Sequence, residues 1–242
     1  MTGELHTFGA HMRGHLEQVE AHNAAALDDV VGLMLAVTSR DQRIHVTGTG
    51  HSTALVLETF YRAGGLACVS PILHPALIPL LGGAASTVME RTEGLAAVLL
   101  AQAAPEPGEL AFVFSASGVN AVPVELAEGL RDAGATVVAV TSLPHLRAAP
   151  ARVGRKLDAV ADVVLDIDTP VGDVAYGEGP QRTAALSSLT SVYLWNLLLA
   201  RLADRAAEAG VELPLWSSAN IPGGDDRNAA LLERYRARIP LL

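Results

Sequence analysis

Short apolar runs that alternate with helix-like segments constrain the fold of this chain more than any other feature. Five runs have the length of buried strands, at residues 43–48, 66–69, 110–114, 136–141 and 161–166. Strands that alternate with helices form a parallel sheet with helices on both faces. We therefore predict an α/β fold, a three-layer α-β-α sandwich around a mainly parallel five-stranded sheet.

The rest of the sequence divides into a long N-terminal helix, a core and a C-terminal tail, at about 4–38, 43–210 and 213–242. Apolar residues at helical spacing predict five further helices, over 52–62, 89–102, 121–133, 186–209 and 226–237. Two segments rich in Gly and Pro, 70–86 and 168–184, are predicted as loops. We expect one domain over residues 1–242.

Two of the predicted strand-to-helix loops are alike, because both consist of small and hydroxyl-bearing residues. The first covers residues 48–52, with the sequence GTGHS, and the second covers residues 115–120, with the sequence SASGVN. Such loops direct backbone N–H groups toward the start of the next helix, which makes an anion site, most often for phosphate. In a parallel sheet, ligands bind at the carboxyl ends of the strands, where both loops lie. We therefore predict that one ligand is held between them.

Charge and composition exclude several classes of partner. The net charge is −9 and no basic run is present, so we expect no nucleic-acid partner. The N-terminus lacks the pattern of a signal peptide, and the apolar run at 192–200 is too short to span a bilayer. We therefore expect a cytoplasmic protein with no membrane partner. No cofactor or metal is expected, because dipoles can hold a phosphate and no cluster of metal ligands is evident.

Several segments together resemble the sugar isomerase (SIS) phosphosugar-binding family over nearly the whole chain. They are GTGHS at 48–52, FYRAGG at 60–65, MERTEG at 89–94, SASG at 115–118, NAVPVE at 120–125, VTS at 140–142 and SANIPGGD at 218–225. The tail segment is the most specific of them. The pattern looks like a bacterial branch of single-domain SIS proteins. SIS domains form dimers with sites at or near the subunit boundary, so the resemblance implies a homodimer.

The resemblance also implies which residues bind a sugar phosphate. The second loop and the helix after it are expected to hold the phosphate, and the first loop to face phosphate or sugar hydroxyls. A serine pair at the start of the long C-terminal helix is expected to join them. The binding residues so implied are Gly48, Gly50, Ser52, Ser115, Ser117, Gly118, Asn120, Ser187 and Ser188.

Proton transfer beside the carbonyl of an opened sugar needs a general base and usually an acid. Glu58 follows the first loop and can pair with Arg62 at i, i+4 spacing, either in the site or as a structural ion pair at a dimer interface. Related SIS enzymes often carry an acidic residue where Arg62 stands, which makes Arg62 a candidate clamp for phosphate or carboxylate.

Three other residues are candidates for proton transfer. SIS enzymes that cleave lactyl ethers place a second acidic residue in the region of Glu90 and Glu93. Glu93 is also explained by placement at a helix N-terminus, where the dipole favours a carboxylate. His51 can titrate near neutral pH and move a proton during ring opening, or simply bond within its loop.

Three functions remain open from the sequence. The first is an enzyme that removes the C2 proton of an amino-sugar phosphate, such as N-acetylglucosamine 6-phosphate, and eliminates a C3 group. The second is an aldose–ketose isomerase, and the third is a sensor of sugar phosphates. We rank elimination just above isomerisation. In the tail, Asn220 and Asp225 are candidates to reach a neighbouring subunit's site, with a Gly-Gly turn and a helix cap as the alternative.

Overall fold

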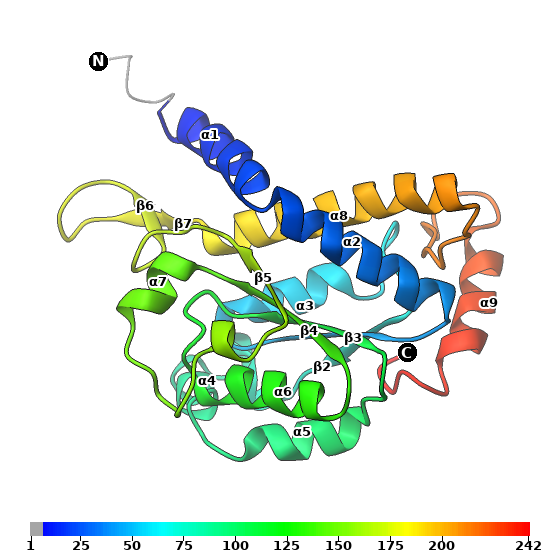
Figure 1. Ribbon diagram of the computed structural model, residues 1–242, viewed down its shortest axis with the longest axis horizontal. Coiled ribbons are helices and arrows are strands. Elements are labelled where there is room, and N and C mark those ends of the chain that lie inside the picture. Colours follow the sequence, from blue (N-terminus) through cyan, green and yellow to red (C-terminus); the bar gives the residue numbers. More distant parts are fainter. Residues whose placement is uncertain (1–6) are drawn as a thin grey trace.

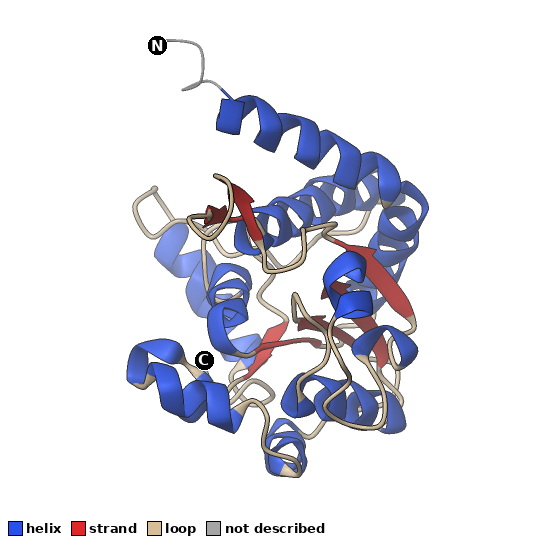
Figure 2. Ribbon diagram, turned by 90° about the vertical axis from the view of Figure 1, so that its left-hand side faces the viewer, coloured by secondary structure: helices blue, strands red, loops and turns tan. Residues whose placement is uncertain are grey.

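Helices cover both faces of a sheet whose five strands all run parallel (Figures 1 and 2). The structure is a computed structural model, and it describes residues 7–242. The strands are β1 (Ile44–Gly48), β2 (Val69–Ile72), β3 (Leu110–Phe114), β4 (Thr136–Thr141) and β5 (Val163–Asp166). Their order in the sheet is β2-β1-β3-β4-β5. The predicted fold class is confirmed.

Two apolar clusters, one on each face of the sheet, form the core. The helices are α1 (Thr7–His22), α2 (Ala24–Ser39), α3 (Thr53–Thr59), α4 (Gly83–Met89), α5 (Leu95–Ala103), α6 (Ala121–Asp132), α7 (Leu143–Ala148), α8 (Ser187–Ala209) and α9 (Gly224–Tyr235). Residues of α2, α3 and α8 pack on one face, with Trp195 against Phe112, and residues of α5 and α6 pack on the other. Within residues 7–242, no helix is both long and apolar enough to cross a membrane.

The long N-terminal helix that the sequence predicts is divided at Asn23 into α1 and α2. The side-chain amide of Asn23 donates to the carbonyl of Asp166 at 2.8 Å and its oxygen accepts from the Asp166 N–H at 2.8 Å. Asn23 thereby completes the hydrogen bonding of the edge strand β5, which helps to avoid an exposed sheet edge. Figure 1 shows that α1 extends beyond the sheet, and residues 4–6 of the predicted helix lie outside the described residues.

Other predicted boundaries also shift. The second strand lies at Val69–Ile72 and not at 66–69, and it contains Pro71, which an edge strand tolerates. The predicted loop at 168–184 contains a hairpin of two short strands, β6 (Val174–Tyr176) and β7 (Thr183–Ala185). Most of the loop predicted at 70–86 is also structured, since it holds the rest of β2, two 3-10 turns and the first residues of α4.

The C-terminal tail packs against the amino edge of the sheet. Leu215 forms an antiparallel bridge with Leu66, just before β2 begins. Tyr235 is fully buried, and its hydroxyl donates to the carboxylate of Asp41 at 2.9 Å. Arg238 also donates to the Asp41 carboxylate, at 2.8 Å. These contacts fix α9 beside the turn between α2 and β1, at the opposite edge from the two hydroxyl-rich loops.

Candidate functional site

The two hydroxyl-rich loops lie side by side at the carboxyl edge of the sheet. The first loop follows β1 and the second follows β3, and these strands are hydrogen-bonded neighbours. In the order β2-β1-β3-β4-β5, β2 lies on one side of β1 and β3 lies on the other. The strand order therefore reverses between β1 and β3. Open α/β sheets bind ligands at such a switch point. The fold thus places both loops where the sequence predicts a shared ligand.

Glycine shapes the second loop. Gly118 has a φ of 62°, and a Cβ there would lie 2.5 Å from Leu146 and 3.0 Å from the Thr141 hydroxyl. Its N–H donates to the hydroxyl of Ser115 at 3.2 Å, and Ser115 is buried. Only glycine fits this conformation and this space without a shift of its neighbours. The loop is therefore held tightly between β3 and α7.

Two polar side chains of the second loop, within residues 7–242, remain without protein partners. Asn120 occupies the N-cap position of α6, but its side chain makes no capping hydrogen bond. Within residues 7–242, the side chains of Ser117 and Asn120 have no hydrogen-bond partner, and both are partly exposed. A hydroxyl, an amide and the N-terminus of a 12-residue helix therefore face the same edge. This arrangement can bind an anion through dipoles alone.

Glycine also allows the close packing of the first loop. A Cβ on Gly48 would lie 2.6 Å from the backbone oxygen of Ser52, and Gly50 has a φ of 57°. His51 is exposed and Ser52 is partly buried, at the start of α3. The backbone turn that the sequence predicts here is present, and the side chains of His51 and Ser52 lie at the carboxyl edge.

Glu90 contacts the first loop and the helix that follows the second loop. The Thr49 hydroxyl donates to the Glu90 carboxylate at 2.8 Å, and the Val122 N–H of α6 donates to the Glu90 carbonyl at 3.1 Å. A Cβ on Gly50 would lie 3.4 Å from the same carboxylate oxygen. Glu90 follows α4 and is partly buried. Sequence reasoning did not single out Thr49, although its place between two glycines of the first loop was a usable signal.

Within residues 7–242, the side chains of Glu58, Arg62 and Glu93 form no hydrogen bond or ion pair with either loop. Glu58 forms an ion pair with Arg62 and accepts a long hydrogen bond of 3.5 Å from Asn196 on α8. Because α3 ends at Thr59, Arg62 lies past the helix, at the amino edge of the sheet, and is exposed. Glu93 is exposed ahead of α5, and its side chain has no partner within residues 7–242. Their predicted roles in the site stay predictions.

The serine pair on α8 contacts a different element from the loops. Asp173, just before the β6–β7 hairpin, accepts hydrogen bonds from the Ser187 N–H at 2.8 Å and from its hydroxyl at 2.5 Å. The carboxylate of Asp173 thus caps α8, while Ser188 is partly exposed beside it. Among residues 7–242, no group of three or more His, Cys, Asp or Glu side chains is arranged to hold a metal ion.

The structure contains a buried charge cluster at the amino edge of the sheet that the sequence did not predict. Arg43 and Glu109, just ahead of β1 and β3, form an ion pair at 2.6 Å, and the carboxylate of Glu109 also contacts His45 at 2.7 Å. Burial raises the pKa of Glu109, but hydrogen bonds from His45 and Arg43 outweigh it and lower the pKa to about 2. A charged residue directly before each of two buried strands was the available signal.

Comparison with known proteins identifies the family of the chain. The family model for the SIS domain matches residues 7–142, so the chain belongs to the SIS domain family. It is similar to UPF0309 proteins of Brucella canis and Brucella melitensis, each 38% identical over 221 residues, which is 90% of this chain and 90% of each relative. The fold and the two loops therefore belong to a domain whose known structures include phosphosugar isomerases and regulators.

Solved structures show the same fold. A phosphoheptose isomerase from Neisseria gonorrhoeae superposes with a TM-score of 0.53 at 17% identity, over 84% of this chain and 97% of that one. The Vibrio vulnificus NanR protein complexed with ManNAc-6P superposes with a TM-score of 0.53 at 16% identity, over 100% of this chain and 71% of that one. The sugar isomerase domain of an RpiR transcription factor from Sphaerobacter thermophilus superposes with a TM-score of 0.51 at 16% identity. The match covers 98% of this chain and 99% of that one.

Proposed function

We propose that the protein binds a phosphosugar at the carboxyl edge of its sheet and transfers a proton between two carbon atoms of the sugar. The observation that carries this proposal is the Glu90 carboxylate, which accepts a hydrogen bond of 2.8 Å from the Thr49 hydroxyl of the first loop. A carboxylate fixed beside an anion site is suited to act as a general base. Ser117, Asn120 and the N-terminus of α6 supply donors for the phosphate.

Isomerisation of an aldose phosphate to a ketose phosphate is the reaction that this arrangement supports best. Isomerisation removes a proton from C2 and returns one to C1, so one carboxylate can serve both transfers. Glu90 contacts the first loop, whereas Glu58 contacts Arg62 and Asn196. The geometry therefore favours isomerisation over the elimination that the sequence ranked first.

Elimination is the second candidate. If the substrate is an amino-sugar 6-phosphate with an N-acetyl group at C2, the carbanion has no route to a simple ketose and expels the C3 group instead. The leaving group then needs an acid. The exposed imidazole of His51 lies in the first loop beside Gly50, and Gly50 lies close to the Glu90 carboxylate. This placement suits His51 to donate the proton.

The test is incubation with a panel of sugar phosphates in deuterated water, followed by NMR of the C2 position. Exchange at C2 with a ketose product supports isomerisation, and exchange with an unsaturated product supports elimination. Glu90→Gln should lower the exchange rate by about 100-fold or more, since positioned general bases contribute about 10²–10⁴-fold. Glu58→Gln is the matched control and should retain most of the rate. Binding without exchange on any sugar phosphate would replace the enzyme proposal with the sensor.

We also propose that the protein forms a homodimer. Leu80 is 92% exposed and Leu81 is 69% exposed on a short 3-10 turn that contacts α4, where Val88 is 65% exposed. Apolar side chains gathered so openly on a surface are typical of protein interfaces. Sedimentation analysis of the wild type and of Leu80→Glu tests the proposal, with a dimer expected for the first and a shift toward monomer for the second.

A further inference from the structure

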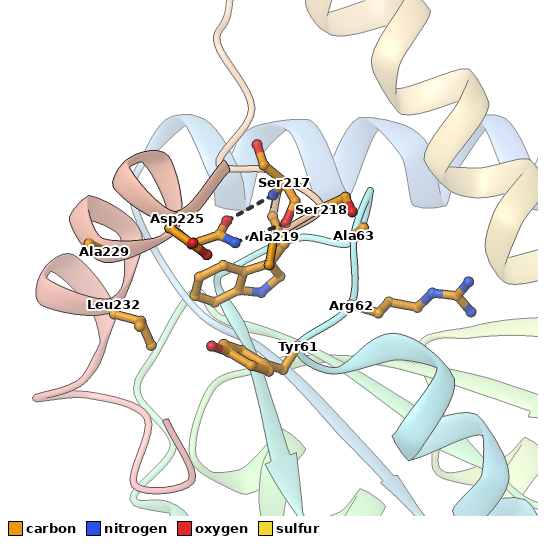
Figure 3. Close-up of a pocket in the computed structure, with 11 residues that line it drawn as sticks. Tyr61, Arg62, Ala63, Ser217, Ser218, Ala219, Asp225, Ala229 and Leu232 are labelled. Atoms are coloured by element: carbon orange, nitrogen blue, oxygen red, sulfur yellow. Dashed lines mark hydrogen bonds between the residues drawn. The ribbon is translucent and has the colours of Figure 1, made fainter. Parts of the chain in front are cut away.

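A cavity lies at the amino edge of the sheet, and Figure 3 shows residues that line it. Its volume of about 340 Å3 falls within the range of small-molecule sites, which is roughly 300–1,000 Å3. One wall comes from the turn after α3, at Tyr61–Ala63, and the other walls come from tail residues 216–219 and from α9.

An aromatic side chain is fixed at the mouth of this cavity. The Tyr61 ring packs against Trp216 with centroids 4.8 Å apart, and Tyr61 is 53% exposed while Trp216 is buried. Tyr61 has a φ of 47°, a conformation that costs a non-glycine residue energy. Backbone hydrogen bonds of Trp216 with Gly64 at 2.8 Å and Gly65 at 2.9 Å hold the turn in place. In Figure 3 the Tyr61 ring points toward Leu232.

The uncompensated charge in the cavity is negative. Asp225, in the first turn of α9, is exposed and has no hydrogen-bond or ion-pair partner within residues 7–242. Arg62 is the other charged lining residue, but it is paired with Glu58, and in Figure 3 its side chain extends away from the cavity. A cation is therefore favoured near Asp225, and a phosphate is disfavoured.

The tail is folded so that it presents these groups rigidly. The amide of Asn228 accepts from the Ser217 N–H and donates to the Ser217 carbonyl, both at 2.9 Å. A Cβ on Gly224 would lie 2.1 Å from the backbone oxygen of Ser218, so the turn requires glycine there. The Gly-Gly pair thus sets the start of α9, and with it the position of Asp225.

We propose that this cavity binds an amino sugar that carries no phosphate group. The apolar face of a sugar ring and its ammonium group are both attracted to the face of an aromatic ring such as that of Tyr61. The Asp225 carboxylate can form a charge-assisted hydrogen bond with the ammonium group. The proposal goes beyond the reaction at the carboxyl edge and does not depend on it.

Calorimetry with glucosamine at mildly acidic pH, where its amine is charged, tests this proposal on the full chain. Glucosamine should bind saturably, and glucose should bind about tenfold more weakly because it lacks the charged donor. Asp225→Asn should weaken glucosamine binding about tenfold, by the same reasoning. Asp226→Asn is the matched control, because Asp226 lies next along α9 and does not line the cavity. It should leave the affinity within about twofold.

Tyr61→Gly tests the aromatic wall, and glycine relieves the left-handed conformation, which offsets part of the packing lost against Trp216. We expect this variant to stay folded and to lose at least about tenfold in affinity for glucosamine. Absence of saturable glucosamine binding, equal binding of glucose, or equal effects of the Asp225 and Asp226 variants would overturn the proposal. Gly118→Ala at the carboxyl edge should not change glucosamine binding, so this proposal and the proposed reaction fail separately.

Discussion

The buried charge cluster at the amino edge of the sheet differs from the two loops at the carboxyl edge in how its polar groups are paired. At the amino edge, Arg43, His45 and Glu109 are buried and bonded to one another, and Arg43 donates further to the carbonyl groups of Ala103 and Ala104. At the carboxyl edge, hydroxyl and amide groups stay partly exposed. The side chains without a hydrogen-bond partner there, within residues 7–242, include those of Ser52, Ser117 and Asn120.

This difference separates the buried cluster of Arg43, His45 and Glu109, which stabilises the fold, from the open groups of the two loops. A buried charge costs free energy unless it is paired, so the charges of Arg43 and Glu109 must be satisfied by the protein itself. The donors at the carboxyl edge remain open to a ligand, and glycines hold their backbone in place at positions 48, 50 and 118. Substitutions at the two edges should therefore change different measurements.

Glu109→Ala should have the largest effect on stability. It leaves Arg43 and His45 buried without their carboxylate, and breaking a buried ion pair costs about 3–5 kcal/mol. Urea unfolding should show a loss of that size in the free energy of unfolding, while the folded fraction still binds sugar phosphate. Glu93→Ala is the control, because the side chain is exposed and the change should stay within about 0.5 kcal/mol. A loss below about 1 kcal/mol for Glu109→Ala would show that the two edges do not differ in this way.

Acid should weaken the amino edge in a defined range. The pKa of Glu109 falls from an ordinary 4.5 to about 2 in the folded protein, so its contribution to stability is complete above pH 4.5 and is lost as the pH falls toward 2. The shift corresponds to roughly 3 kcal/mol at one pKa unit per 1.36 kcal/mol. Comparison of unfolding free energies for the wild type and Glu109→Gln across this range tests the expectation. Parallel pH curves for the two proteins would contradict it.

The carboxyl edge was more predictable from the sequence than the amino edge. An apolar run, a loop of small hydroxyl-bearing residues and a helix form one local pattern, so both loops and their shared edge could be predicted. The contact of Thr49 with Glu90 joins residues that are 41 positions apart, so it could not be predicted from a local pattern. Arg43 and Glu109 are 66 residues apart, and only the register that pairs Ile44 with Leu110 brings them together.

The shifted boundaries have physical causes that a local pattern does not contain. The apolar run at 66–69 was assigned to a strand, but most of it lies ahead of β2 and pairs with the tail, where Leu66 bridges Leu215. The division of the N-terminal helix depends on Asn23, whose partner Asp166 is 143 residues away. Helical spacing continues through Asn23, so no local pattern marks the break.

Gly118→Ala should have an intermediate effect, at the carboxyl edge. The new Cβ would lie 2.5 Å from Leu146 in a left-handed conformation, so the second loop must move. We expect a loss of about 10- to 100-fold in affinity for a sugar phosphate, which is about 1.4–2.7 kcal/mol. Gly154→Ala is the control, since a Cβ there meets nothing within 4 Å. Unchanged affinity in Gly118→Ala, measured by calorimetry, would remove the second loop from the site.

Glu58→Gln should have the smallest effect, and it sharpens the comparison most. The ion pair of Glu58 with the exposed Arg62 should contribute at most about 1 kcal/mol to stability, because solvent screens such pairs. We expect urea unfolding and proton exchange at C2 to stay close to the wild-type values. Loss of exchange with unchanged stability would mean that Glu58 acts in catalysis although it contacts neither loop of its own chain. In a dimer, that result would place the carboxyl end of α3, where Glu58 lies, at the site of the partner subunit. The division between the two edges would then hold within one chain but not across the assembly.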